Sequence, residues 1–349
     1  MGWRRPIFEA FVGLNGLFAP RVSRLPEQPQ TIFVLRNNDI GDLLVITPLF
    51  AALKKKYPNA EILAGVGHWN REALIANPHV TEVLELNAPW HNNFIANQGL
   101  LSVLRYIYLS AELNALKEAR ADIGIDVLGS GFGSLLMMQA QIPYRLGVRG
   151  YAGGNSSAQR CVQYREDEHV GRQALRFAEL LGCTDLPENR PQIFLDRPPE
   201  PNGAIVIAPG AGLPEKRWPG KYFAELARML NHCNIMVIGS RNDVPLAAQI
   251  REKNPRARDL TGRLSLREAF AAIGGAKIVV SNSSMAMHAA AAFRRPTVVV
   301  LSQAFESAVS HHRQWGYPET VFLGRDVKHN EIFRPEEVAE RIQEILRES

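Results

Sequence analysis

Carboxylates, glycines and basic side chains gather in three short segments of the sequence, and the first contains two acidic residues. Residues 36–48 read RNNDIGDLLVITP, with Asp42 directly after Gly41. A carboxylate at such a point can act as a general base, or it can cap the N-terminus of the helix that follows. Asp39 is a competing carboxylate in the same segment. Because the segment follows an apolar run and precedes a helical pattern, we expect backbone N–H groups and a positive helix end beside these side chains.

The second segment combines glycines with basic residues. Residues 208–219 read APGAGLPEKRWP. Gly210 and Gly212 would let a ligand approach the backbone closely, and Lys216 or Arg217 could neutralise a diphosphate. The alternative is a Gly/Pro loop whose charges are simply solvated.

The third segment places hydroxyl groups at the start of a helix. Residues 281–288 read SNSSMAMH. Ser283 and Ser284 suit both helix capping and phosphate binding. His288 falls one turn later on the same helix face as Ser284. It could bind a ligand or be a hydrogen-bonded core histidine.

Strand and helix patterns must position these segments. β-Branched apolar runs alternate with helical patterns throughout. Strands are predicted at 31–35, 61–66, 83–86, 123–127, 204–208, 235–238, 278–280 and 297–301, and helices at 43–57, 101–120, 170–181, 222–230, 266–273, 285–293 and 335–346. This alternation predicts parallel sheets covered by helices, with a domain boundary in the Pro-rich residues 197–203. The predicted fold class is α/β, with two Rossmann-like doubly wound domains and a ligand cleft between their strand C-termini.

Length and composition exclude several classes of protein. The chain has 349 residues, of which 46% are hydrophobic and 21% charged, as expected for two globular domains. The three cysteines are far apart, so we expect no disulfide or metal site and a reducing compartment. A net charge of +5 favours phosphorylated ligands or anionic membranes without indicating nucleic acid. The sequence lacks the glycine fingerprint of dehydrogenases and the motifs of zinc and serine hydrolases, and we expect no cofactor.

Residues 1–25 form a separate amphipathic segment. The apolar positions 7, 8, 11, 14, 17 and 18 follow helical spacing, and arginines stand at both ends. Such a helix could lie on a membrane surface or pack against the body of the protein.

Taken in order, these segments resemble glycosyltransferase family 9, the ADP-heptose:lipopolysaccharide heptosyltransferases, over residues 31–346. The motifs that carry the resemblance are IGDLLVITP at 40–48, LKKKYP at 53–58, NPHVTEV at 77–83, YRLG at 144–147, His169 with Arg172, PGAGLPEKRW at 209–218, NSSMAMH at 282–288 and Arg295–Pro296.

The resemblance implies a GT-B fold with two Rossmann-like domains facing a cleft. It assigns residues 30–190 to an acceptor domain, residues 203–330 to a nucleotide-sugar domain, and residues 335–349 to a helix that packs back on the N-terminal domain. It further implies metal-independent, inverting transfer of heptose from ADP-L-glycero-β-D-manno-heptose to a lipopolysaccharide core acceptor. The implied roles are Asp42 as general base; Gly210, Gly212, Lys216, Ser283, Ser284 and His288 as donor-binding residues; and Asn38, Arg145 and Arg149 as acceptor-binding residues.

Two departures from the family pattern leave the donor open. Ser283 stands where the family usually has a carboxylate, and Met285 stands where it usually has glycine. Transfer of another nucleotide sugar to a different surface glycan, a binding-only pseudoenzyme and a GT-B epimerase are the alternatives; for Arg145 and Arg149, a plain surface role is an equal reading. An acceptor glycolipid would place the protein in the cytoplasm, at the inner face of the cytoplasmic membrane.

Overall fold

The computed structural model describes residues 4–326 and 331–348, and the chain divides into two α/β units. Unit 1 ends at Asn189 and unit 2 begins at Arg190. The division precedes the Pro-rich stretch in which the sequence placed it. Arg190 donates to the carbonyl of Ala291 and pairs with both carboxylate oxygens of Glu319, so the chain is already anchored to unit 2 at this point.

Unit 1 is built on a six-stranded parallel sheet with the order β3-β2-β1-β4-β5-β6. Its strands are β1 (Thr31–Leu35), β2 (Glu61–Val66), β3 (Glu82–Glu85), β4 (Ile123–Asp126), β5 (Tyr144–Arg149) and β6 (Arg160–Gln163). The central β1 reads TIFVL and is buried along its whole length, as expected for a parallel strand covered on both faces. The family-like YRLG motif lies in β5, which the strand pattern did not predict.

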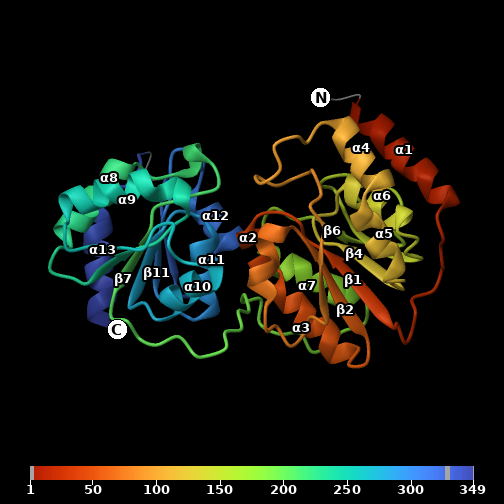
Figure 1. Cartoon of the computed structure of the whole chain (residues 1–349), viewed down its shortest axis with the longest axis horizontal. Helices are drawn as coiled ribbons and strands as arrows, with labels where there is room; N and C mark the ends of the chain where they lie inside the picture. Colours follow the sequence, from red (N-terminus) through yellow and green to blue (C-terminus); the bar gives the residue numbers. More distant parts are fainter. Residues whose placement is uncertain (1–3, 327–330, 349) are drawn as a thin grey trace. The chain divides into compact units, whose positions relative to one another are not determined.

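Helices cover both faces of this sheet (Figure 1). They are α1 (Arg4–Phe18), α2 (Ile40–Leu44), α3 (Thr47–Lys56), α4 (Leu100–Leu109), α5 (Ala111–Glu118), α6 (Gly131–Gln139) and α7 (Val170–Leu180), with a 3₁₀ turn at His68–Leu74. Helices α1, α4 and α5 pack around α6 on one face, and α3 packs on α7 on the other. The single helix expected over 101–120 is two helices, because Ser110 caps α5 by accepting a hydrogen bond from the Leu113 N–H.

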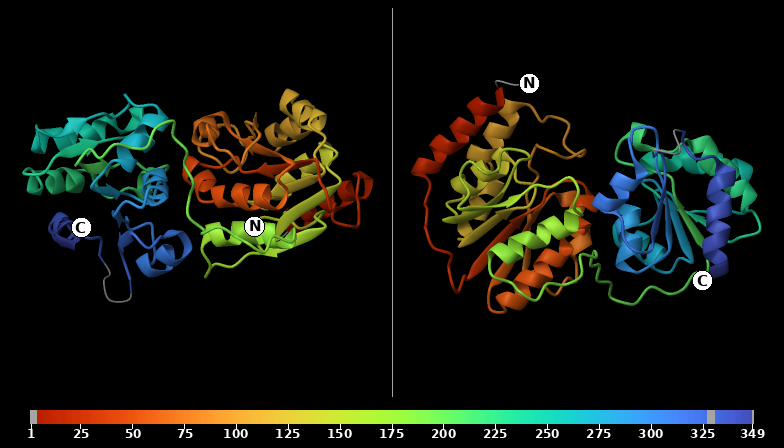
Figure 2. Two further views of the ribbon diagram at one scale, coloured as in Figure 1. Left: turned by 90° about the horizontal axis from the view of Figure 1, so that it is seen from below. Right: turned by 180° about the vertical axis from the view of Figure 1, so that it is seen from behind.

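Unit 2 repeats the same strand order in its own parallel sheet, β12-β11-β10-β7-β8-β9. Its strands are β7 (Ile205–Ala208), β8 (Ile235–Val237), β9 (Arg258–Asp259), β10 (Ile278–Ser281), β11 (Thr297–Val300) and β12 (Thr320–Leu323). Its helices are α8 (Gly220–Met229), α9 (Val244–Lys253), α10 (Leu266–Gly274), α11 (Met285–Ala292), α12 (Ala308–Trp315) and α13 (Pro335–Glu348), with 3₁₀ turns at Pro214–Lys216 and Arg241–Asp243. Figure 2 shows helices on both sides of this sheet.

The last helix departs from its expected position. Val338, Ala339 and Ile342 of α13 are buried in the core of unit 2, and the helix packs on α8 and β11. This packing makes α13 part of unit 2, whereas the resemblance implied a helix over residues 335–349 that packs back on the N-terminal domain. The amphipathic pattern of α13 explains this packing, because its apolar face covers the same side of the unit 2 sheet as α8 and α9 and completes the core on that side.

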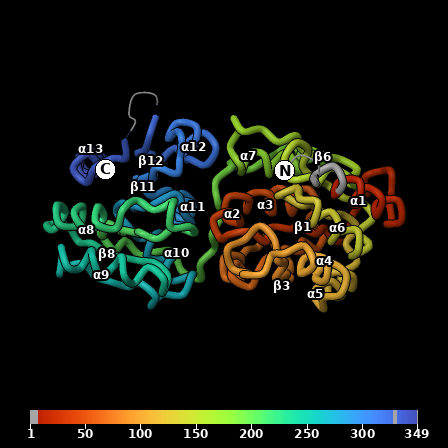
Figure 3. Tube along the Cα trace, turned by 90° about the horizontal axis from the view of Figure 1, so that it is seen from above, coloured from red at the N-terminus to blue at the C-terminus, as the bar shows by residue number. Residues whose placement is uncertain are grey.

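The first helix belongs to unit 1. Phe8 and Val12 of α1 join the core formed with α6, and Figure 3 shows α1 at the outside of the unit beside α6. Within the described residues, no helix combines the length and the apolar character that crossing a bilayer requires.

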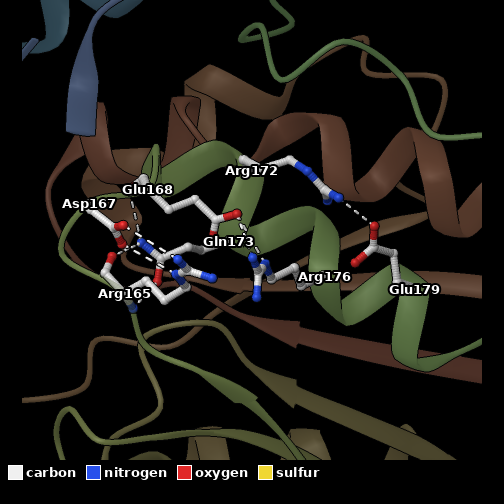
Figure 4. A network of polar contacts seen from close by, with 7 residues as sticks. All are labelled: Arg165, Asp167, Glu168, Arg172, Gln173, Arg176 and Glu179. Atoms are coloured by element: carbon white, nitrogen blue, oxygen red, sulfur yellow. Dashed lines mark hydrogen bonds and ion pairs between the residues drawn. The ribbon is translucent and has the colours of Figure 1, made fainter. Parts of the chain in front are cut away.

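A polar network fixes the turn between β6 and α7 (Figure 4). The Gln173 amide accepts from the Arg165 N–H and donates to the carbonyls of Arg165 and Glu168, at 2.8–3.1 Å. Arg176 binds the Glu168 carboxylate through two nitrogens, and Arg165 pairs with Asp167. These contacts fix the loop between β6 and α7, which lies at the C-terminal edge of the unit 1 sheet, where ligands of such sheets bind.

Candidate functional site

In both sheets the strand order reverses direction at the central pair, and ligands of doubly wound sheets bind at the C-terminal ends of that pair. The pairs are β1 and β4 in unit 1, and β7 and β10 in unit 2. The three segments singled out in the sequence follow β1, β7 and β10. Each unit therefore carries its polar residues at its own switch point.

In unit 1, a buried arginine holds the predicted base. Arg36 directly follows β1, and its Nη2 lies 3.0 Å from the Asp42 Oδ1. Its Nε also donates to the Asp42 carbonyl at 3.2 Å. The Arg36 side chain is 6% exposed and that of Asp42 is 29% exposed. Asp42 is thus an oriented carboxylate that stays open to solvent.

Neither carboxylate of this segment caps α2. Asp39 occupies the cap position without a side-chain cap hydrogen bond, and its oxygens accept from the N–H and the amide of Asn93. Asp42 lies within the first helical turn, where the helix dipole favours a negative charge. Of the two sequence alternatives for Asp42, the cap is excluded by its position.

A second carboxylate, Asp126, lies at the C-terminal end of β4. It is fully buried and accepts hydrogen bonds from the N–H and the hydroxyl of Ser130. Gly133 of α6 approaches so closely that a Cβ there would lie 2.1 Å from the Asp126 Oδ2. Burial raises the pKa of Asp126 to about 6, although the hydrogen bonds and the charge of Arg36 act in the opposite direction. Arg36 therefore acts on two carboxylates, the partly exposed Asp42 and the buried Asp126.

The predicted acceptor residue Asn38 supports the surrounding loops. Its amide donates to the His91 carbonyl at 2.5 Å, and its own carbonyl accepts from Trp69 Nε1 and the Asn70 amide. Trp69 stacks on Phe94 with ring centroids 4.7 Å apart. Asn38 thus joins the loop after β1 to the 3₁₀ turn after β2.

The two predicted acceptor arginines of β5 have opposite environments. Arg145 is 1% exposed, and its guanidinium donates to the carbonyls of Pro20, Ile142 and Ser157. Burial lowers its pKa to about 10. The prediction that Arg145 contacts acceptor phosphates is wrong, because its donors serve backbone carbonyls in the interior. Arg149 is exposed at the C-terminal end of β5, and its acceptor-binding role stays a prediction.

In unit 2, one asparagine fastens the two predicted donor segments together. The Oδ1 of Asn282 accepts from the Trp218 N–H at 2.7 Å. Its Nδ2 donates to the carbonyls of Pro209 and Gly210 at 2.8 and 3.1 Å. The loop after β10 is thereby joined to the loop after β7.

The glycine-rich loop directs its two basic residues differently. Arg217 donates to the Ala211 carbonyl and lies 3.7 Å from Asp243, whereas Lys216 is exposed. Gly210 packs against Asp243, and a Cβ at this glycine would lie 2.6 Å from the Asp243 Oδ2. Of the two cations that the sequence offered for a diphosphate, Lys216 is the one that faces solvent.

The hydroxyl groups at the start of α11 differ in their partners. The Ser283 Oγ lies 2.8 Å from the His311 Nε2, and Ser284, the cap residue, makes no side-chain cap hydrogen bond. Burial and the charge of Lys216 lower the pKa of His311 to about 4, so this imidazole is neutral at neutral pH. The helix start thus presents hydroxyls without a fixed negative charge.

His288 lies deeper in unit 2. It is buried, and its Nδ1 is 2.7 Å from the Tyr317 hydroxyl. Its ring also packs edge-on against Trp315 and Tyr317. This arrangement favours the core-histidine alternative over donor binding.

Comparison with known proteins assigns the family. The sequence model of glycosyltransferase family 9 (heptosyltransferase) matches residues 111–304, more than half of the chain. The chain belongs to glycosyltransferase family 9. This family 9 protein is accordingly a glycosyltransferase enzyme.

Named relatives extend the match over most of the transferase. It is 28% identical over 319 residues to lipopolysaccharide heptosyltransferase 2 of Salmonella typhimurium, covering 80% of this chain and 86% of the relative. It is 27% identical over 314 residues to the protein of the same name from Escherichia coli, with the same coverage.

Solved structures confirm the fold class. A family 9 glycosyltransferase from Veillonella parvula superposes with a TM-score of 0.75 at 17% identity, covering 94% of this chain and all of the other. ADP-heptose LPS heptosyltransferase II of E. coli gives a TM-score of 0.70 at 22% identity, covering 91% and 99%. The transferase has the predicted GT-B class of fold, two α/β domains each built on a parallel sheet.

The sequence pattern assigns no role to three polar residues that lie near these segments, Arg36 and Asp126 in unit 1 and His311 in unit 2. Arg36 was seen only as the start of a segment, although a cation directly after a buried strand and six residues before a carboxylate is a usable signal. Asp126 was part of a strand pattern. His311 follows Ser283 by 28 residues, and no local pattern connects them.

Proposed function

We propose that this transferase moves a heptose from ADP-L-glycero-β-D-manno-heptose to a lipopolysaccharide core acceptor. The named lipopolysaccharide heptosyltransferases from Salmonella and E. coli, aligned over 80% of the chain, support heptose as the transferred sugar and lipopolysaccharide as the acceptor. The observation that carries the mechanism is the Asp42 carboxylate, held at 3.0 Å by Arg36 and still open to solvent.

In the proposed step, Asp42 accepts the proton of an acceptor hydroxyl while that oxygen attacks the anomeric carbon of the heptose. The new glycosidic C–O bond forms on the face opposite the nucleotide. The bond from the anomeric carbon to the phosphate oxygen breaks at the same time, and ADP leaves with its electron pair. A single displacement of this kind inverts the anomeric configuration.

Groups of unit 2 would stabilise the departing diphosphate. The exposed Lys216 supplies a positive charge, and the glycine loop at Gly210 and Gly212 allows backbone N–H groups to approach phosphate oxygens. The start of α11, with Ser283 and Ser284, adds helix N–H groups and hydroxyls. In the proposal these protein groups compensate the charge that develops on the leaving group.

The proposed acceptor side lies in unit 1. Arg149 is exposed at the same sheet edge as Asp42 and suits a phosphate of the acceptor core. A lipid-linked acceptor would place the reaction in the cytoplasm, at the inner face of the cytoplasmic membrane.

Asp42→Asn tests the mechanism. The variant keeps the shape of the side chain but cannot take up a proton, so we expect turnover to fall by about 10²–10⁴-fold. Donor affinity, measured by calorimetry with ADP-heptose, should stay within about twofold, because the proposed donor groups belong to unit 2. Undiminished turnover would remove Asp42 from the chemistry.

The Ser283–His311 pair favours one alternative, transfer of a different nucleotide sugar. This pair offers a hydroxyl and a neutral imidazole at the start of α11, not an anion. A panel of ADP-, UDP- and GDP-sugars distinguishes ADP-heptose from a different donor. Each sugar is assayed with lipid A–core acceptors by nucleotide release and by mass spectrometry of the products. Binding of a nucleotide sugar without any transfer would instead indicate a pseudoenzyme.

A further inference from the structure

Helix α1 is apolar on two opposite faces. Phe8 and Val12 pack into unit 1, and Gly16 approaches Ser157 and Met138. The outer face is apolar as well, and its side chains are exposed among the described residues. Its exposed residues are Phe11, Leu14, Leu17 and Phe18. A surface helix of a globular protein normally presents polar side chains on its outer face, so this face is unusual.

Helix α4 extends the same surface. The Tyr108 hydroxyl donates to the Asn15 Oδ1 at 3.0 Å, which joins α4 to α1, and both helices pack on α6. Val103 and Ile107 are the buried side of α4. The exposed side carries Leu100, Leu101, Tyr108 and Leu109. We call the eight exposed residues of the two helices the α1–α4 face. Figure 1 shows the two helices next to each other at the edge of unit 1.

Exposed large apolar residues are concentrated on this face. Of the fourteen in the described part of the chain, eight belong to it. Isolated apolar residues on a surface need no explanation, but a cluster of this kind marks a site of interaction.

Charge identifies the partner of the face. Arg105 is exposed one helical turn after Leu101, and Arg21 and Arg24 are exposed just beyond the end of α1. Glu9, the single acidic residue of α1, lies beside Gly153 of the protein body. Apolar side chains bordered by arginines suit an anionic lipid surface, whereas two copies joined through this face would bring their arginines together.

We propose that the α1–α4 face docks unit 1 onto an anionic phospholipid bilayer, with the leucines of both helices entering the headgroup region. This deepens the proposed function, since it gives the transferase a defined way to meet a membrane-embedded acceptor. The surface is made by two helices from separate parts of the sequence, so α1 alone is not sufficient.

Vesicle co-sedimentation of the full chain tests the proposal. The vesicles are phosphatidylcholine with or without phosphatidylglycerol, and the variants are Leu17→Asp in α1 and Leu101→Asp in α4. The side chains are 76% and 83% exposed, so both variants should fold. Val309→Asp, at a 57% exposed position in unit 2, is the matched control. We expect wild type and control to bind the anionic vesicles, and each leucine variant to bind about tenfold more weakly.

The other outcomes overturn the proposal. Equal binding by all four proteins, or no binding by wild type, would mean that the face does not dock on lipid. Loss of binding in Leu17→Asp alone would reduce the surface to α1. Sedimentation velocity that shows a wild-type dimer, dissociated by both variants, would identify a second copy as the occupant.

A separate assay distinguishes this proposal from the proposed function. Transfer to a deacylated, water-soluble core acceptor should be the same in wild type and in both leucine variants. Vesicle binding without any heptose transfer would refute the function and leave the surface standing. Heptose transfer without vesicle binding would refute the docking surface and leave the proposed function standing.

Discussion

Replacement of Arg36 should impair catalysis through Asp42. Arg36 makes two charge-assisted hydrogen bonds to Asp42, at 3.0 and 3.2 Å, from a side chain that is only 6% exposed. A hydrogen bond to a charged group contributes about 1.5–3 kcal/mol. If the orientation of the carboxylate is needed in the transition state, loss of this amount corresponds to a roughly 10- to 150-fold lower kcat.

The variants are Arg36→Met, which removes both hydrogen bonds, and Arg36→Lys, which keeps the charge but can replace only one. We expect the full loss of kcat in the first and a smaller, about tenfold loss in the second. The KM for the donor should be unchanged in both, because the proposed donor groups are in unit 2. Thermal unfolding of each variant controls for damage to the fold.

A double-mutant cycle with Asp42→Asn decides whether Arg36 acts through Asp42. If it does, Arg36→Met in the Asp42→Asn background should cost little further activity. Additive losses in the double variant would refute the reasoning and place the action of Arg36 elsewhere, for example on the substrate itself.

Three further predictions concern charged side chains of unit 1. The pKa of Asp126 is raised from 3.8 to about 6 in the folded state, so the folded protein holds this proton more tightly than the unfolded chain. Its contribution to stability is complete below about pH 4 and is lost as the pH rises to about 6. Asp126→Asn should remove this slope, worth roughly 3 kcal/mol, in urea unfolding measured across that range; an unchanged slope would contradict the assignment. Arg145→Met should lower the free energy of unfolding by about 3 kcal/mol, because three carbonyls lose their donor, while the KM for the acceptor stays constant. Arg149→Ala should raise the KM for the acceptor and leave the free energy of unfolding unchanged. A raised acceptor KM in Arg145→Met would instead indicate that Arg145 binds the acceptor.

The order of strands and helices could be predicted because the central strands are buried on both faces. Apart from Thr31 at the start of β1, β1 and β7 consist of continuous apolar residues, and such runs stand out from amphipathic helices. β5 lacks this pattern because Arg145 lies within it. The arginine is tolerated there since Pro20, 125 residues away in the sequence, supplies a carbonyl. A partner so distant cannot be recognised from a local pattern.

The candidate site was predictable to a similar degree. The segments around Asp42, Gly210 and Ser283 could be located because each follows a buried strand. The roles of individual side chains within them depend on folding contacts, as Arg36 and His311 show. Burial also distinguishes between alternatives that the sequence leaves equal. Arg145 is buried whereas Arg149 is exposed, and the buried His288 contacts the Tyr317 hydroxyl.

The connection that Asn282 makes between two loops of unit 2 has a consequence for ligand binding. Its three hydrogen bonds tie the loops after β7 and β10 to each other. A nucleotide sugar would meet these loops already assembled, so little conformational entropy is lost when it arrives. Removal of these hydrogen bonds would therefore weaken the affinity for the nucleotide sugar, because the two loops would move more in the unliganded protein. The side chains proposed to contact the ligand would be unchanged.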